Sequence, residues 1–282
     1  MRAAILLVFL LCAAGPARAE EVRPLVGSLG SHTAVEGETL LDIAARYGLA
    51  IDHLCFANDW PATATRIYPG TPVVLPLARI LPANPPSTGL VINLPERGLY
   101  FFKGGRFQGF YAISIGLAKD YQTPTGSYSI VSRVRDPVWY PPAWAKEKKP
   151  VGPGPNNPLG DRWLGLSLPR YGIHSTNKPL NVGLSTTHGC IRMYPDAIRS
   201  LFEQVTVGTP VRIEYETAKV GRGADGQVYL TAFPDVYKRS DPVEAGRKVL
   251  VGLGLGNRWC ARLADELKRG RGLPVSLEAP LN

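Results

Sequence analysis

The sequence predicts a mainly β domain with one or two helices, preceded by a small α+β unit of βααβ order. Two patterns support this prediction. Residues 31–76 show a helical spacing of apolar residues between two short strands, whereas from residue 89 to about 216 short apolar runs alternate with Gly and Pro turns. The chain has 282 residues, of which 45% are hydrophobic, so it can form more than one core.

The first nineteen residues have the composition of a secretory signal peptide. Arg2 is followed by an apolar run over residues 3–14 and by a small-residue site at 17–19. We therefore expect cleavage near Ala19 and an exported protein. No later stretch approaches the ~20 apolar residues of a membrane span, so no transmembrane anchor is expected.

The chain is basic, with a formal net charge of +9 at pH 7. Such an excess favours an anionic polymer such as a cell-wall glycan, or else only keeps a solvated surface soluble. No RRM, helix-turn-helix or zinc-finger pattern is present, so nucleic acid is not expected as a partner. No CxxC or HxxxH spacing occurs, so neither a metal site nor a cofactor is expected.

In the N-terminal unit, Thr39 is a good N-cap for a first helix, and Asp42 follows it by three positions. The apolar face of this helix comprises Leu40, Ile43, Ala44 and Tyr47. A second short helix is expected at about 51–58. A Pro-Gly turn and a strand at 72–75 follow it.

A proline-rich segment, residues 77–88, is expected to link this unit to the β domain of residues 89–216 and to leave the two independently folded. Within the β domain, the segment 136–160 contains seven prolines and two tryptophans. Loops of this length are often lids over a site. One helix is expected to begin near Pro195. Strands are expected at 89–94, 99–103, 107–115, 127–134, 163–168 and 170–174.

Residues 217–282 form a C-terminal extension. A strand is expected at 227–233 and a basic amphipathic helix near 257–269. These patterns indicate structure but no function.

Reactive side chains gather in the segment 171–193. Two of the four histidines, His174 and His188, lie within sixteen residues of Cys190. If residues 187–193 are extended, His188, Cys190 and Arg192 share one face, and Gly189 leaves room for a substrate carbonyl. An imidazole near a thiol favours the thiolate, so the segment is a candidate nucleophile and base. The alternative is a buried structural cysteine with two satisfied histidines.

The N-terminal unit of residues 31–76 resembles a LysM module. The resemblance rests on residues 32–48 and on residues 68–76. LysM modules generally bind the N-acetylglucosamine of peptidoglycan or chitin, so the resemblance implies contact with glycan. The alternative is a packing domain without sugar affinity.

Residues 174–179 and 185–193 are similar to the active-site signature of the L,D-transpeptidases, which have a YkuD-type catalytic domain. Further similarity lies in residues 91–102, 123–126 and 151–160. With the signal peptide and the LysM-like unit, the chain resembles the ErfK/YbiS group. The resemblance implies a YkuD-like mixed β-sandwich at 89–216 and a periplasmic location.

Carried over by this resemblance, Cys190 is the nucleophile and His174 the general base. The backbone carbonyl of Ser175 would orient the imidazole, and the N–H groups around His188, Gly189 and Cys190 would form an oxyanion hole.

Three further residues are candidate substrate contacts. Arg192 matches the family arginine and could pair with a substrate carboxylate, or could instead hold its strand through a salt bridge. Thr187 and Asn177 are the other two candidates.

The implied reaction is two-step acyl transfer. Cys190 would attack the amide between meso-diaminopimelate and the terminal D-Ala of a peptidoglycan tetrapeptide stem, release D-Ala, and hold the stem as a thioester. Three acceptors stay open: another diaminopimelate amine, a lysine of an outer-membrane lipoprotein, or water, which would make the protein a carboxypeptidase. The resemblance also implies acylation by carbapenems. The rival from another class is a non-catalytic wall-binding protein.

Three cysteines remain after the expected cleavage. If Cys190 stays reduced for catalysis, Cys55 and Cys260 are left in an oxidising compartment, and we expect a disulfide between them. The alternatives are two inert thiols, or pairing of Cys260 between molecules.

Overall fold

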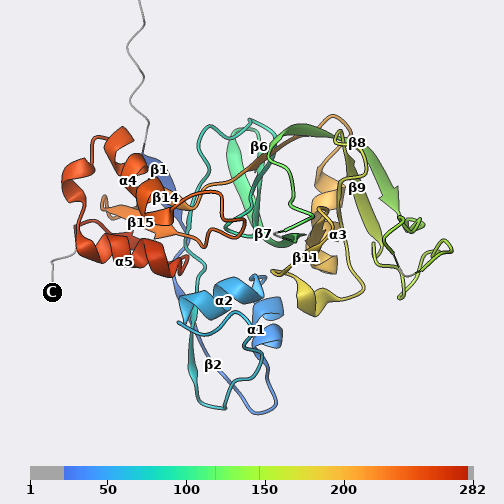
Figure 1. Cartoon of the computed structure of the whole chain (residues 1–282), viewed down its shortest axis with the longest axis horizontal. Helices are drawn as coiled ribbons and strands as arrows, with labels where there is room; N and C mark the ends of the chain where they lie inside the picture. Colours follow the sequence, from blue (N-terminus) through green and yellow to red (C-terminus); the bar gives the residue numbers. More distant parts are fainter. Residues whose placement is uncertain (1–21, 118, 146, 279–282) are drawn as a thin grey trace, which may run out of the picture.

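The computed structural model describes residues 22–278 except 118 and 146, so the predicted signal peptide lies outside the described part. Figure 1 shows three parts: the N-terminal helices at the bottom, the large β domain on the right, and a C-terminal unit of strands and helices on the left. Among the described residues, no helix is long and apolar enough to span a membrane.

The N-terminal unit has the predicted βααβ order. Its two strands pair antiparallel, with His32 opposite Val73. The capping box at Thr39 is complete, because the Asp42 N–H donates to Thr39 Oγ1 (3.2 Å) and the Thr39 N–H donates to Asp42 Oδ2 (2.9 Å). The elements are β2 (Gly30–Thr33), α1 (Leu40–Arg46), α2 (Ile51–Ala57) and β3 (Pro72–Leu75).

The central domain is a nine-stranded sheet, in the order β11-β7-β12-β10-β9-β8-β13-β5-β6. Because β6 also pairs with β7, the ladder closes on itself around an apolar core that includes Phe101, Ile113 and Leu201. The strands are β5 (Gly89–Asn93), β6 (Gly98–Lys103), β7 (Arg106–Gly116), β8 (Gly126–Arg135), β9 (Arg162–Leu166), β10 (Gly172–His174), β11 (Ser185–Thr187), β12 (Ile191–Met193) and β13 (Pro210–Glu214).

The strands predicted between residues 89 and 174 all occur, with ends within two residues of the expected ones. Helix α3 (Pro195–Gln204) also begins where predicted, and the short 3-10 helix η1 (Pro179–Asn181) precedes β11. The sequence patterns missed β13, and they merged β11 and β12 into one extended segment. The mainly β prediction for this domain is therefore confirmed.

The C-terminal unit is a five-stranded sheet in the order β16-β15-β14-β1-β4, covered by two helices. Helix α4 was missed, although Asp241 caps it by accepting from Val243 N (2.8 Å) and Glu244 N (3.0 Å). The elements are β1 (Arg23–Val26), β4 (Arg79–Ile80), β14 (Ala218–Arg222), β15 (Val228–Ala232), α4 (Pro242–Gly252), η2 (Gly256–Arg258), α5 (Ala261–Arg269) and β16 (Val275–Ser276).

The segment expected to be a free linker, residues 77–88, is partly built into this sheet. Strand β4 pairs with β1, and Ile80 and Leu81 are buried. Strand β1, which precedes the N-terminal unit in the sequence, pairs parallel with β14. Both chain segments that flank the N-terminal unit are thus held by the C-terminal unit, so an independently moving module is not what the structure shows.

The N-terminal unit also docks on the central domain. Arg97 Nε donates to Asp52 Oδ2 of α2 (2.9 Å) and to the Gly183 carbonyl (3.0 Å), and this pair is buried. Gly183 has φ +100°, and a Cβ there would lie 2.5 Å from the Ile51 nitrogen. Only glycine allows the loop before β11 to pack this closely on α2.

The expected disulfide between Cys55 and Cys260 is wrong, since both are free thiols. Cys55 is buried in the N-terminal core, where its Sγ donates to the Ala64 carbonyl (3.7 Å). Cys260 precedes α5 and packs against the core of the C-terminal unit. Each thiol therefore belongs to the core of a different unit.

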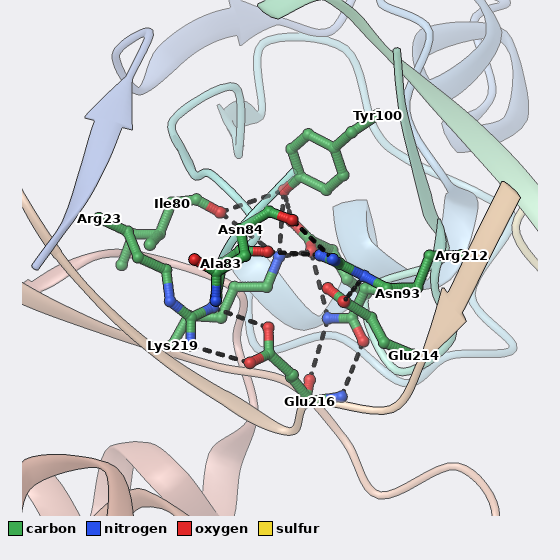
Figure 2. Close-up of polar contacts among 11 residues, drawn as sticks. Arg23, Ile80, Ala83, Asn84, Asn93, Tyr100, Arg212, Glu214, Glu216 and Lys219 are labelled. Carbon is green, nitrogen blue, oxygen red and sulfur yellow. Dashed lines mark hydrogen bonds and ion pairs between the residues drawn. The ribbon is translucent and has the colours of Figure 1, made fainter. Parts of the chain in front are cut away.

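A buried polar network joins the C-terminal unit to the central domain (Figure 2). Lys219 of β14, which is 0% exposed, donates to Glu96 and to Tyr100 Oη (3.3 Å). Beside it, the Asn93 amide donates to the Glu216 carbonyl (3.0 Å), and the Glu216 N–H donates to Asn93 Oδ1 (2.9 Å). Burial alone would raise the pKa of Glu96, but the Lys219 and Arg79 cations and the hydrogen bonds from Lys219 and Tyr100 together outweigh burial and hold that pKa low.

Lys219→Met should therefore lower the free energy of unfolding by about 3–5 kcal/mol, because it leaves the Glu96 carboxylate buried without its cation. Urea denaturation followed by circular dichroism measures this. The matched control is Lys248→Met, which removes a lysine from an exposed pair with Glu244 and should change stability by less than about 1 kcal/mol. Equal effects of the two substitutions would contradict a structural role for the buried pair.

Candidate active site

The register of two parallel strands brings the candidate residues together. In the β10–β12 pair, Ile173 lies opposite Ile191 and His174 lies opposite Arg192. Side chains at directly opposed positions project from the same face of a sheet. Cys190 immediately precedes β12, and its Sγ donates to the Arg170 carbonyl (3.6 Å), in the turn before β10. The thiol therefore lies near the N-terminal end of β10, and His174 is the last residue of that strand.

The imidazole of His174 is buried and held in one orientation. Its Nδ1 lies 2.6 Å from the Ser175 carbonyl oxygen, so we assign the proton to Nδ1 and the free lone pair to Nε2. The Ser175 N–H donates in turn to the Arg162 carbonyl (3.0 Å). On the neighbouring strand, the Trp163 ring stacks on the imidazole with 5.8 Å between ring centroids. The carbonyl contact expected of Ser175 is thus present.

Burial keeps both reactive groups neutral at rest. It lowers the pKa of His174 to about 3, and the Arg192 cation adds to this, against the carbonyls of Ser175 and Leu159. Burial raises the pKa of the Cys190 thiol, although the Gly172 N–H and Arg192 oppose that shift. At neutral pH the site therefore holds a neutral thiol and a neutral imidazole at paired strands, and a neutral imidazole can accept a thiol proton during attack.

The hydroxyl of Thr187 braces the loop that carries Cys190. Thr187 Oγ1 donates to the Cys190 carbonyl (2.6 Å) and accepts the Gly189 N–H (3.2 Å). Thr187, expected as a substrate contact, is buried and engaged within the loop. Because the Gly189 N–H points to this hydroxyl, the N–H groups of His188 and Cys190 are the remaining candidates for the oxyanion hole.

A second brace comes from two residues without a predicted role. Thr123 Oγ1 donates to the Gly189 carbonyl (2.9 Å), and the Thr123 N–H donates to Tyr237 Oη (3.1 Å). Tyr237 Oη itself donates to the Gly116 carbonyl (3.0 Å). Tyr237 follows β15 in the C-terminal extension, so only tertiary structure could reveal it. Thr123 lies in one of the segments similar to the family.

The expected common face of His188 and Cys190 does not form, because Gly189 adopts φ +102° and interrupts the extended chain. His188 packs instead between two aromatic rings. Trp144 stacks on it with 3.5 Å between centroids, and Tyr121 meets it edge-on at 4.2 Å. Trp144 belongs to the proline-rich loop 136–160, which thereby reaches the neighbour of Cys190, as expected of a covering loop.

Arg192 and Asn177 have different surroundings. Arg192 Nε is buried without an acceptor, and among the described residues no carboxylate forms an ion pair with this side chain. That observation favours the substrate-carboxylate role over the structural salt bridge. Asn177 is exposed, and its amide donates to the Asn156 carbonyl (3.2 Å). It lines a cavity of about 240 Å³ with Ser175 and Arg199.

These features define a class of site. A half-buried thiol and a neutral imidazole lie at paired strands, the imidazole Nδ1 is held by a carbonyl, and a cation lies near both groups. Such an arrangement suits a cysteine acyltransferase that uses a nucleophile and a general base.

Comparison with known proteins agrees. Residues 87–213 match the model of the YkuD family, the L,D-transpeptidase catalytic domain. The chain is 31% identical over 263 residues to "Probable L,D-transpeptidase ErfK/SrfK" of Salmonella typhimurium, covering 86% of this chain and 83% of that protein. It is 36% identical over 222 residues to "Probable L,D-transpeptidase YbiS" of Escherichia coli, covering 73% and 70%. The chain therefore belongs to the L,D-transpeptidase family and is an enzyme of that class.

His174→Ala should slow acylation of Cys190 by about 10² or more, because it removes the general base. His188→Ala serves as the matched control and should have a much smaller effect, since His188 contacts Trp144 and Tyr121. Single-turnover acylation followed by intact mass measures both rates. Equal or reversed effects would mean that the two imidazoles are assigned wrongly.

The pH dependence of Cys190 reactivity follows from its raised pKa. Alkylation by iodoacetamide, followed at the Cys190 peptide by mass spectrometry, should keep accelerating to a higher pH than alkylation of an exposed cysteine, because the raised pKa delays formation of the thiolate. Arg192→Met should slow alkylation further at each pH, since the cation stabilises the thiolate. A fast, pH-independent rate between pH 5 and 8 would instead indicate a preformed thiolate-imidazolium pair.

Proposed function

We propose that this enzyme is an exported, periplasmic L,D-transpeptidase that acts on peptidoglycan tetrapeptide stems through a Cys190 thioester. The observation that carries the proposal is the locked imidazole of His174 on the strand paired with the one that follows Cys190. The family match and the signal-like composition of residues 1–19 support it.

In the first step, the Cys190 thiol proton passes to His174 Nε2 as sulfur attacks the carbonyl carbon of the amide before the terminal D-Ala. The C–N bond then breaks, and the proton on His174 passes to the departing D-Ala amine. The stem remains as a thioester on sulfur. Arg192 would pair with a carboxylate of the stem, a role supported by its lack of a carboxylate partner among the described residues.

In the second step, an acceptor amine gives its proton to His174 and attacks the thioester, and Cys190 regains its proton as it departs. We propose an amine acceptor, either a second diaminopimelate or a lipoprotein lysine. The stacking of Trp144 on His188, the neighbour of Cys190, supports transfer over hydrolysis if loop 136–160 closes over a bound stem and keeps water from the thioester. Hydrolysis at the same site is the second candidate outcome.

We further propose that the N-terminal βααβ unit is a LysM module that holds glycan. Its element order and capping box support this. Its docking through Asp52 and Arg97 would carry bound glycan at a constant position relative to the active-site loop. The rival reading, a wall-binding protein without catalysis, gives no reason for the arrangement of Cys190 and His174.

Cys190→Ala should abolish release of D-Ala from a defined tetrapeptide muropeptide, because only the thiol can form the thioester. Mass spectrometry of the muropeptide products measures the loss and also identifies the acceptor. A carbapenem should add its mass to the unmodified protein and not to Cys190→Ala. Circular dichroism confirms that the variant is folded, and full D-Ala release by such a folded variant would refute the mechanism.

A further inference from the structure

A cavity of about 310 Å³ lies where the N-terminal unit meets the two sheets. It is distinct from the acyl-transfer site. Phe110 lines the cavity, whereas Gly116 accepts a hydrogen bond from Tyr237, which braces the active-site loop. The two residues lie six positions apart on β7, or about 20 Å at ~3.3 Å per residue. Its volume is in the range of about 300–1,000 Å³ that is usual for small-ligand sites. Its walls include Tyr47, Leu49, Leu77, Arg79, Phe107 and Phe110.

Arg79 gives this cavity its chemistry. The side chain is only 7% exposed, and its guanidinium carbon lies 4.1 Å above the centroid of the Phe110 ring. Its Nη1 donates to the carbonyls of Pro76 and Ala78, but its Nε is buried and has no acceptor within the described residues. A buried donor of a charged group without an acceptor is costly unless a ligand supplies one.

No resident carboxylate neutralises Arg79 in the described part of the chain. The nearby carboxylate of Glu96 is already bound by Lys219 and Tyr100. Burial lowers the pKa of Arg79, and the proximity of Tyr100 and Glu96 offsets this only in part. The cavity therefore presents a guanidinium with carbonyl acceptors but no carboxylate partner, between aromatic walls.

We propose that this cavity binds a carboxylate carried on a compact body with an apolar face, supplied by the bacterial wall. The guanidinium would donate to the carboxylate, while Phe107, Phe110 and Tyr47 would pack against the C–H groups of the body. The carboxylate belongs either to a muramyl residue without its stem or to the end of a stem peptide. The wall as source rests on the proposed function, whereas the carboxylate preference rests on Arg79 alone.

The test uses two pairs of probes that differ in the carboxylate. N-acetylmuramic acid is compared with N-acetylglucosamine, and N-acetyl-D-alanine with N-acetyl-D-alaninamide. Binding to the Cys190→Ala protein is followed by calorimetry and by ligand-detected NMR, so that no chemistry interferes. At least one acid should bind about tenfold or more tightly than its neutral counterpart, and which acid does so identifies the source.

Two variants assign the binding to this cavity. Arg79→Met keeps an apolar stem over Phe110 but removes the charge, and Leu77→Glu places a competing carboxylate in the cavity wall at a position that is 36% exposed. Both should abolish binding. The matched control Arg106→Met removes an exposed arginine from the same strand as Phe110 and should leave binding unchanged. If Arg79→Met does not fold, Leu77→Glu decides.

The proposal is overturned if neither acid binds, if the neutral probes bind equally well, or if binding survives in both cavity variants. Its failure is separable from that of the proposed function. D-Ala release from a muropeptide depends on Cys190, whereas this binding is measured in a protein that lacks that thiol.

Discussion

The parallel pairing of β10 with β12 is the constraint on which the active site depends. The register sets His174 opposite Arg192, and it places Cys190 beside the turn that leads into β10. Three chemically different groups thereby meet although 18 positions separate the paired residues Ile173 and Ile191. The pairing holds because β10 and β12 lie inside a sheet that closes on itself, with Ile173, Ile191 and Met193 packed in its core. A shift of the register by one residue would turn these side chains to the opposite face.

Burial at this point has an electrostatic consequence. A thiol and an imidazole in water would titrate near their usual values, but here burial moves the pKa of Cys190 up and that of His174 down. The resting site is therefore uncharged except for Arg192, and charge separation is postponed until a substrate carbonyl is present. The hydrogen bond from His174 Nδ1 to the Ser175 carbonyl keeps the basic nitrogen available without a buried carboxylate as third partner. The Gly189 N–H donates to the Thr187 hydroxyl, and the Gly189 carbonyl accepts from the Thr123 hydroxyl. The loop is therefore held in place where an oxyanion would form.

The three units of the chain support this site jointly. Helix α2 packs on Gly183, in the segment between the two histidines, and Arg97 bonds both to α2 and to that segment. Tyr237 of the C-terminal extension reaches Thr123 and so the loop of Gly189. The extension is itself secured by the buried Lys219–Glu96 pair and by the parallel pairing of β1 with β14 (Figures 1 and 2). Units that look separable along the sequence are consequently one connected framework.

The sequence by itself determined the βααβ order of the N-terminal unit, most strands of the central domain, the helix after Pro195 and the group of Cys190, His174 and Arg192. The helices and strands follow from local signals, namely apolar periodicity and caps, which act over a few residues, whereas the roles of Cys190 and His174 came from the resemblance to the L,D-transpeptidases. Only the tertiary structure decided that residues 77–88 join a sheet, that Cys55 and Cys260 belong to separate cores, that His188 faces Trp144, and that Tyr237 braces the active-site loop. Contacts such as Arg23 with Glu216 join residues 193 positions apart. No local pattern encodes such a contact, because it depends on how complete elements pack together.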